Sequence, residues 1–123
     1  SGLEDAGFMT PDDMKKRTRG FALEVITLAE SLPNTSFGRI VQNQLIRCGT
    51  SVASNYRAAC RAKSRRDFLS KMGTVEEETD ESAFWIELLV LKGTVSKERV
   101  QSLLTEADEI LSIVVSSLKT ARL

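Results

Sequence analysis

The sequence contains no histidine among its 123 residues. Histidine is the most frequent general base and zinc ligand in proteins, so its absence excludes Ser-His and Cys-His nucleophiles. It also excludes the Glu-x-x-His motifs of di-iron helix bundles. No glycine-rich phosphate loop of the P-loop or Rossmann type is present. We therefore expect a protein that is not an enzyme and that uses no cofactor and no metal.

Cysteine is scarce, and no long apolar run occurs. Cys48 and Cys60 fall in one predicted helix about 18 Å apart along its axis, which is too far for a disulfide. Without a disulfide framework, a signal-peptide pattern or a membrane-spanning run, we expect a soluble, cytoplasmic protein with no membrane role. Because Ser1-Gly2 stands where an initiator methionine is expected, we expect residues 1–9 to be disordered or expression-derived, with Met9 as the native start.

Net charge is also absent, because 17 basic residues balance 17 acidic ones. No global field therefore draws the protein to nucleic acid or to an anionic membrane, and electrostatic recognition must come from local patches. The length fits a single domain, and a composition of 41% hydrophobic but only 6% aromatic residues favours helices over strands.

Apolar residues recur at three- and four-residue spacing in four segments, which predicts four helices. Caps and turns delimit these segments to about residues 10–32, 36–62, 64–92 and 96–121. Short connections make sequential helices antiparallel neighbours, so the predicted fold is an all-α, up-down-up-down four-helix bundle over residues 10–123. Gly49 and Gly73 lie inside predicted helices, and we expect them to mark close helix contacts.

The third and fourth helices carry more apolar residues than one core stripe requires. A helix that is apolar on more than one face usually has a second surface to cover. We therefore expect a homo-oligomer, with interface candidates Phe84, Trp85, Leu88, Leu91 and Ile113.

Polar and charged residues beside the apolar stripes of the second and third helices predict a structural polar cluster, whose candidate members are Arg47, Asn55, Glu78, Asp80 and Glu81. Glu78 and Glu81 flank the Trp85 side of one helix, where they can meet Arg47 or Arg57 of the other. Asn55 sits beside the core stripe, a position where a polar residue usually fixes register. If these groups form a buried pair, removal of one member costs about 3 to 5 kcal/mol.

A local basic patch lies where the second helix turns into the third. Five cations occur between Arg57 and Arg66 with no acid among them. Such a patch can contact phosphates, but without interleaved aromatic residues it reads no bases. The alternative is that Arg57 and Arg61 pair with acids of the third helix. The candidate nucleic-acid-binding residues are Arg57, Arg61, Lys63, Arg65, Arg66 and Lys71.

Three stretches together resemble a bacterial protein family. They are Arg47-Cys48-Gly49-Thr50-Ser51-Val52-Ala53-Ser54-Asn55-Tyr56-Arg57, Arg65-Arg66-Asp67-Phe68, and Glu78-Thr79-Asp80-Glu81-Ser82-Ala83-Phe84-Trp85-Ile86-Glu87-Leu88-Leu89. They resemble four-helix bundle proteins related to those encoded by 23S rRNA intervening sequences, and the resemblance covers roughly residues 12–121. The polar set typical of that family maps onto Arg47, Asn55, Arg57, Glu78, Asp80 and Glu81. Many relatives carry glutamate where this chain has Ala58, so an ion pair built on that acid is not expected here.

The resemblance implies an antiparallel four-helix bundle that assembles as a ring-like homopentamer with no established enzymatic activity. Some relatives are encoded inside ribosomal RNA insertions, and the similar accessory protein of diversity-generating retroelements binds nucleic acid and a reverse transcriptase.

Three functions remain open. They are a nucleic-acid or ribonucleoprotein accessory module that uses the basic tips, a scaffold that binds a protein partner, and a carboxylate-metal enzyme. The missing histidines disfavour the enzyme.

Overall fold

The computed structural model describes residues 9–123. The prediction for residues 1–9 therefore lies, apart from Met9, outside the described residues. The described chain forms helices α2 (Pro11–Glu30), α3 (Ser36–Cys60), α4 (Arg65–Lys92) and α5 (Lys97–Ala121), and no strand occurs within it. The prediction of an all-α protein with four helices is confirmed.

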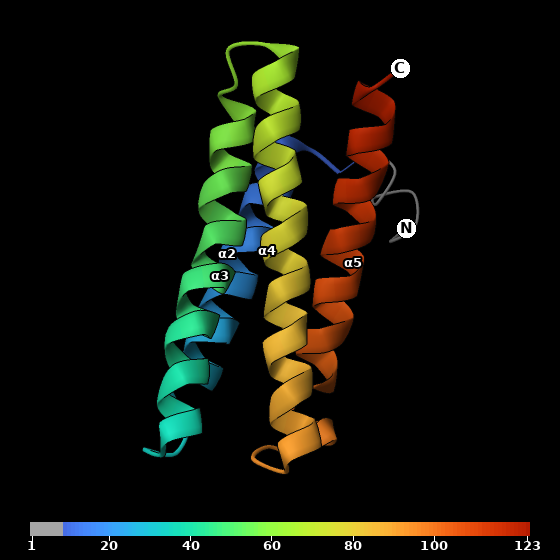
Figure 1. The fold of residues 1–123 in the computed structure, drawn as a ribbon. Coiled ribbons are helices and arrows are strands. Elements are labelled where there is room, and N and C mark those ends of the chain that lie inside the picture. Colours follow the sequence, from blue (N-terminus) through green and yellow to red (C-terminus); the bar gives the residue numbers. More distant parts are fainter. Residues whose placement is uncertain (1–8) are drawn as a thin grey trace.

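Each helix packs alongside the next one in the chain. Figure 1 shows the α2–α3 and α4–α5 connections at one end of the bundle and the α3–α4 connection at the other end. Helix α3 contacts both α2 and α4, and α4 contacts α5, whereas α2 and α5 share the least extensive contact of these four adjacent pairs. The seam between α2 and α5 is therefore the most open part of the bundle.

Side-chain caps set the helix starts. Thr10 and Asp13 form a reciprocal capping box at the start of α2, with the Asp13 amide donating to Thr10 Oγ1 at 3.1 Å. Ser64 accepts from the Asp67 amide at 3.0 Å, and Ser96 caps α5 in the same way. The Asp67 carboxylate accepts from the Lys63 amide instead of the Ser64 amide, so the reciprocal bond of a capping box is not formed at Ser64.

One buried core runs between the four helices. Its largest fully buried side chains include Phe21, Leu45, Met72, Ile86 and Ile110, contributed by all four helices. Burial of each large apolar side chain stabilises the fold by about 1.5 to 3 kcal/mol. The predicted apolar stripes therefore face inward and hold the bundle together.

The two helical glycines differ in their surroundings. A Cβ at Gly49 would lie 2.6 Å from Val25 Cγ1 and 2.9 Å from Val25 Cβ, so this glycine allows α2 and α3 to approach closely. Gly73 has no heavy atom within 4 Å of the corresponding position. The expectation of a close helix contact is therefore wrong at Gly73, because that face of α4 meets no neighbour.

Candidate functional site

The predicted cations gather around the α3–α4 connection, at the upper end of the bundle in Figure 1. Arg57 lies in the last turn of α3, Arg61 follows its C-terminus, and Arg65 and Arg66 open α4. All of them are exposed, as is Lys63 in the connection itself. We call Arg57, Arg61, Lys63, Arg65 and Arg66 the basic end.

Three arginines of the basic end stand apart from the carboxylates that the structure describes. Within residues 9–123, Arg57, Arg61 and Arg66 form no ion pair with a carboxylate. The alternative prediction, that Arg57 and Arg61 form ion pairs with acids of the third helix, is therefore wrong for the described chain. These two side chains emerge beyond the acidic middle of α4, whose glutamates meet Arg47 instead.

Two other predicted cations, Arg65 and Lys71, have partners. Arg65 Nε donates to the Ala121 carbonyl and so ties the start of α4 to the end of α5. Lys71 lies 3.7 Å from Asp67 one turn away on the same helix. These two residues therefore have less freedom to contact a phosphate than Arg57, Arg61 and Arg66.

A shallow groove between α2 and α3 extends the positive surface beyond the residues expected from the sequence. Lys15 and Arg19 of α2 line this groove together with Arg57, around a volume of about 360 Å³. Its floor includes Leu23, which is 64% exposed. Lys15 also lies 3.8 Å from Asp12. The i, i+4 spacing of Lys15 and Arg19 indicated a shared face, but only the packing of α2 shows that this face meets Arg57.

The predicted polar cluster is partly assembled. Arg47 Nη1 lies 3.1 Å from Glu78 Oε2, and Arg47 Nη2 contacts Glu81. Glu81 also accepts from Trp85 Nε1 at 3.2 Å. The Arg47 side chain is 48% exposed and that of Glu78 is 15% exposed, so the pair is not buried. The loss of about 3 to 5 kcal/mol that is typical of breaking a buried pair therefore does not apply to it.

Two predicted members stand apart from this cluster. Asn55 Nδ2 donates to the Ser51 carbonyl at 3.0 Å and to Ser51 Oγ at 2.8 Å, so it bonds within its own helix and does not join α3 to α4. Asp80 is exposed on α4. A polar contact between α3 and α4 that the sequence did not suggest joins two other residues: Ser82 Oγ donates to Cys48 Sγ at 3.2 Å.

Both cysteines are free. Cys48 is fully buried, and this burial raises the pKa of its thiol above the ordinary value. A buried thiol with a raised pKa is a poor nucleophile. Cys60 is exposed near the basic end.

The predicted interface residues occupy two places. Phe84, Leu88 and Leu91 share one face of α4, and Phe84 and Leu91 are 50% and 83% exposed. Trp85 packs edge-on against Phe84, with 5.2 Å between ring centroids. Ile113 lies on α5 and faces the α2–α5 seam, so it does not belong to this surface.

The sequence also gave no indication of the ion pairs across the α2–α5 seam. Arg17 Nε lies 2.7 Å from Glu106 Oε2, and Arg17 Nη2 lies 2.5 Å from Glu109 Oε1. The bidentate bond with Glu106, together with the bond to Glu109, raises the pKa of Arg17 above its ordinary value. These bonds join α2 to α5, the adjacent pair of helices with the least extensive contact.

The described residues contain neither a metal site nor a membrane-spanning helix. No group of three or more Cys, Asp or Glu side chains is arranged to hold a metal ion in residues 9–123. In the same range, no helix combines the length and apolar character needed to cross a membrane.

Comparisons with known proteins identify the family. The family model for the 23S rRNA-intervening sequence protein matches residues 12–116. A similar solved structure is that of a protein with unknown function from the S23 ribosomal protein family of Bacteroides thetaiotaomicron VPI-5482. Its TM-score is 0.83 at 30% identity, over 90% of this chain and 99% of that chain. No curated protein sequence shows a significant match. The chain therefore belongs to the family of 23S rRNA-intervening sequence proteins.

Proposed function

We propose that the protein is a non-enzymatic, homo-oligomeric binding module whose basic end contacts the phosphates of RNA or DNA. The observation that carries this proposal is that Arg57, Arg61 and Arg66 are exposed and have no acidic partner within residues 9–123. An unpaired guanidinium can bind a phosphate without first breaking an ion pair. The expected binding tolerates many sequences, because phosphate contacts carry no base information.

Assembly strengthens this proposal. In an antiparallel up-down-up-down bundle the α3–α4 connection lies at one end of every subunit, so a ring repeats the basic end several times. Each additional contact then acts at a high effective concentration, so phosphate contacts that are weak one by one give a higher overall affinity. The exposed face of α4 that carries Phe84, Leu88 and Leu91 supports an oligomer, and the family resemblance favours a pentamer.

The second candidate is an oligomeric scaffold that binds a protein partner and has no nucleic-acid role. The same exposed apolar face of α4 favours it, because such a face fits a protein surface as well as it fits a second copy. The nucleic-acid module requires the cations of the basic end for binding, whereas the scaffold does not.

A matched pair of charge reversals separates the two candidates. Arg66→Glu and Lys97→Glu both place an acid in the first turn of a helix, where the helix dipole favours it, and both sites are exposed. Arg66 belongs to the basic end, whereas Lys97 follows the α4–α5 connection at the opposite end (Figure 1). We expect Arg66→Glu to weaken binding of a single-stranded RNA severalfold in fluorescence anisotropy, and Lys97→Glu to leave it unchanged.

Light scattering checks that both variants keep the parent's mass. Equal affinities of the two variants, or no RNA or DNA binding by the parent at low salt, would contradict the nucleic-acid role and leave the scaffold as the better candidate.

A further inference from the structure

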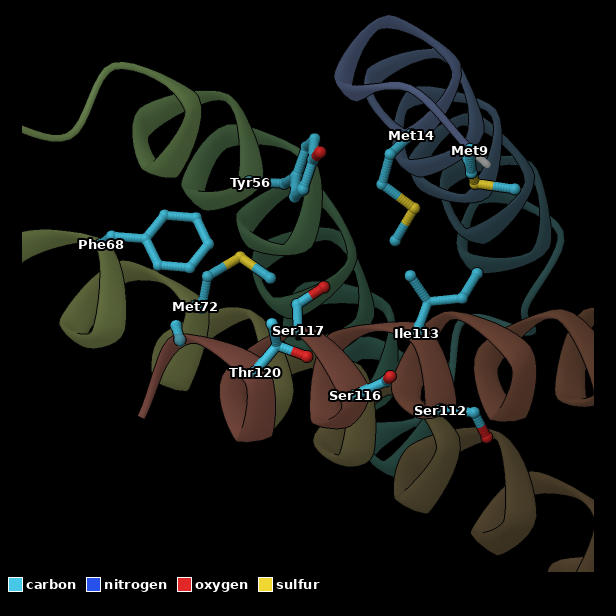
Figure 2. Close-up of a pocket in the computed structure, with 11 residues that line it drawn as sticks. Met9, Met14, Tyr56, Phe68, Met72, Ser112, Ile113, Ser116, Ser117 and Thr120 are labelled. Atoms are coloured by element: carbon cyan, nitrogen blue, oxygen red, sulfur yellow. The ribbon is translucent and has the colours of Figure 1, made fainter. Parts of the chain in front are cut away.

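A cavity of about 590 Å³ opens at the α2–α5 seam, close to the end of the bundle that carries the α3–α4 connection (Figure 2). Residues of all four helices line it. It exists because α2 and α5 share the least extensive contact of the four adjacent helix pairs and do not close over the core here. Its volume lies within the range of about 300 to 1,000 Å³ that is typical of small-molecule sites.

One wall of the cavity is apolar and partly aromatic. Met14, Tyr56, Phe68 and Met72 form this wall, and Ile113 adds an apolar side chain from α5. Met14, Tyr56 and Met72 are each at most 9% exposed, so the surrounding core holds them in place. Thioether sulfurs and aromatic rings both pack favourably against another aromatic ring. This wall therefore suits a flat, apolar ligand.

The facing wall is a row of hydroxyl groups on α5. Ser112, Ser116, Ser117 and Thr120 line the cavity, and within residues 9–123 none of their hydroxyls has a hydrogen-bond partner. Figure 2 shows the Ser117 side chain directed toward the space between Tyr56 and Met14. Burial, with Cys60 beside the ring, raises the pKa of Tyr56, which therefore stays a neutral phenol. The cavity thus offers hydroxyl donors and acceptors opposite an apolar wall.

Among residues 9–123, the 11 that line the cavity include no charged residue. An ionised ligand would lose hydration there without gaining a counter-charge. We propose that this cavity binds an uncharged aromatic molecule that carries one hydrogen-bonding group, with its ring against Tyr56 and Phe68 and its polar group on Ser117. This inference is independent of the proposed nucleic-acid role, because it uses no residue of the basic end.

The methionines of the chain report directly on this cavity. The chain has three methionines, and all three of them, Met9, Met14 and Met72, line it. With 13C-methyl-labelled methionine, every methionine signal in an NMR spectrum therefore comes from the site. We expect 2-naphthol, which is neutral at neutral pH, to shift these signals saturably, and naphthalene-2-sulfonate, which has a similar ring but a charge, to leave them unchanged.

Two variants test the assignment of the polar group. Ser117→Ala removes a hydroxyl from the cavity, whereas Ser70→Ala makes the same change on the exposed surface of α4. We expect Ser117→Ala to weaken binding of 2-naphthol about threefold to tenfold, as loss of one neutral hydrogen bond does, and Ser70→Ala to bind like the parent.

Three results would overturn the proposal. They are methionine signals that 2-naphthol does not move, signals that both naphthalene compounds move alike, and equal affinities for Ser117→Ala and Ser70→Ala. If the signals instead change with protein concentration and 2-naphthol has no effect, a second copy of the chain occupies the cavity, and the proposal is also wrong.

Discussion

Arg47 contacts two carboxylates of the neighbouring helix at once, and its own exposure limits what these contacts contribute. Its side chain is 48% exposed, so water and salt screen its attraction to Glu78 and Glu81. Exposed pairs of this kind contribute about 0.2 to 1 kcal/mol. We therefore expect Glu78→Ala to lower the free energy of unfolding by about 0.5 to 1 kcal/mol relative to a matched control, measured by urea denaturation.

The control for that measurement is Glu77→Ala. Glu77 is exposed on the same helix and makes no ion pair within residues 9–123, so the two variants share the gain in helix propensity. Added salt should reduce the difference between them. If both variants unfold at the same urea concentration, Arg47 and Glu78 do not stabilise the bundle.

At the scale of a helix, the two interior glycines should respond to alanine with opposite signs. Gly49→Ala places a methyl group 2.9 Å from Val25 Cβ, which belongs to a stiff, fully buried side chain. Overpacking of this kind costs about 1 to 3 kcal/mol, which offsets the gain in helix propensity of about 1 kcal/mol. We expect Gly49→Ala to lower the thermal midpoint.

Gly73→Ala is the matched substitution in α4. Its new methyl group meets nothing within 4 Å, so only the propensity gain of about 1 kcal/mol remains and the thermal midpoint should rise. A rise in both variants would mean that α2 and α3 are not closely packed at Gly49.

The helices were predictable because their signals are local. Thr10, Ser64 and Ser96 cap helices at the predicted starts, and two helices end two residues early, α2 at Glu30 and α3 at Cys60. The contact of Arg47 with Glu78 was also within reach, because both residues flank core stripes of neighbouring helices. The bonding of Asn55 was not predictable in this way, because its side-chain amide finds a partner in Ser51, one turn away in the same helix.

The remaining features depend on how far the helices stand apart. The α2–α3 groove with Lys15 and Arg19, the cavity at the α2–α5 seam and the Arg17 ion pairs all depend on the separation between α2 and each of its two neighbours. The periodicity of a single helix carries no information on that separation.

At the scale of the whole molecule, the apolar face of α4 is expected to be covered by other subunits. We expect light scattering to give five times the 13.6 kDa mass of the chain at micromolar concentration, as the family resemblance suggests. Phe84→Glu together with Leu91→Glu should reduce this mass, because each change buries a charge in the apolar contact.

The control for the assembly is Leu23→Glu, which places the same charge on an exposed leucine of α2, away from this face. It should leave the mass unchanged. A parent protein that scatters as a monomer would contradict the oligomer, and loss of mass in the control alone would move the interface to α2.

The most direct test of the proposed function is the salt dependence of RNA binding by the unmodified protein. Each phosphate contact with a single strand contributes a slope of about −0.7 to log K against log salt concentration, so three free arginines of one subunit predict a slope of about −2. A ring that engages several subunits gives a steeper slope. Binding that does not weaken with salt, or no binding even at low ionic strength, would contradict the phosphate-binding role of the basic end.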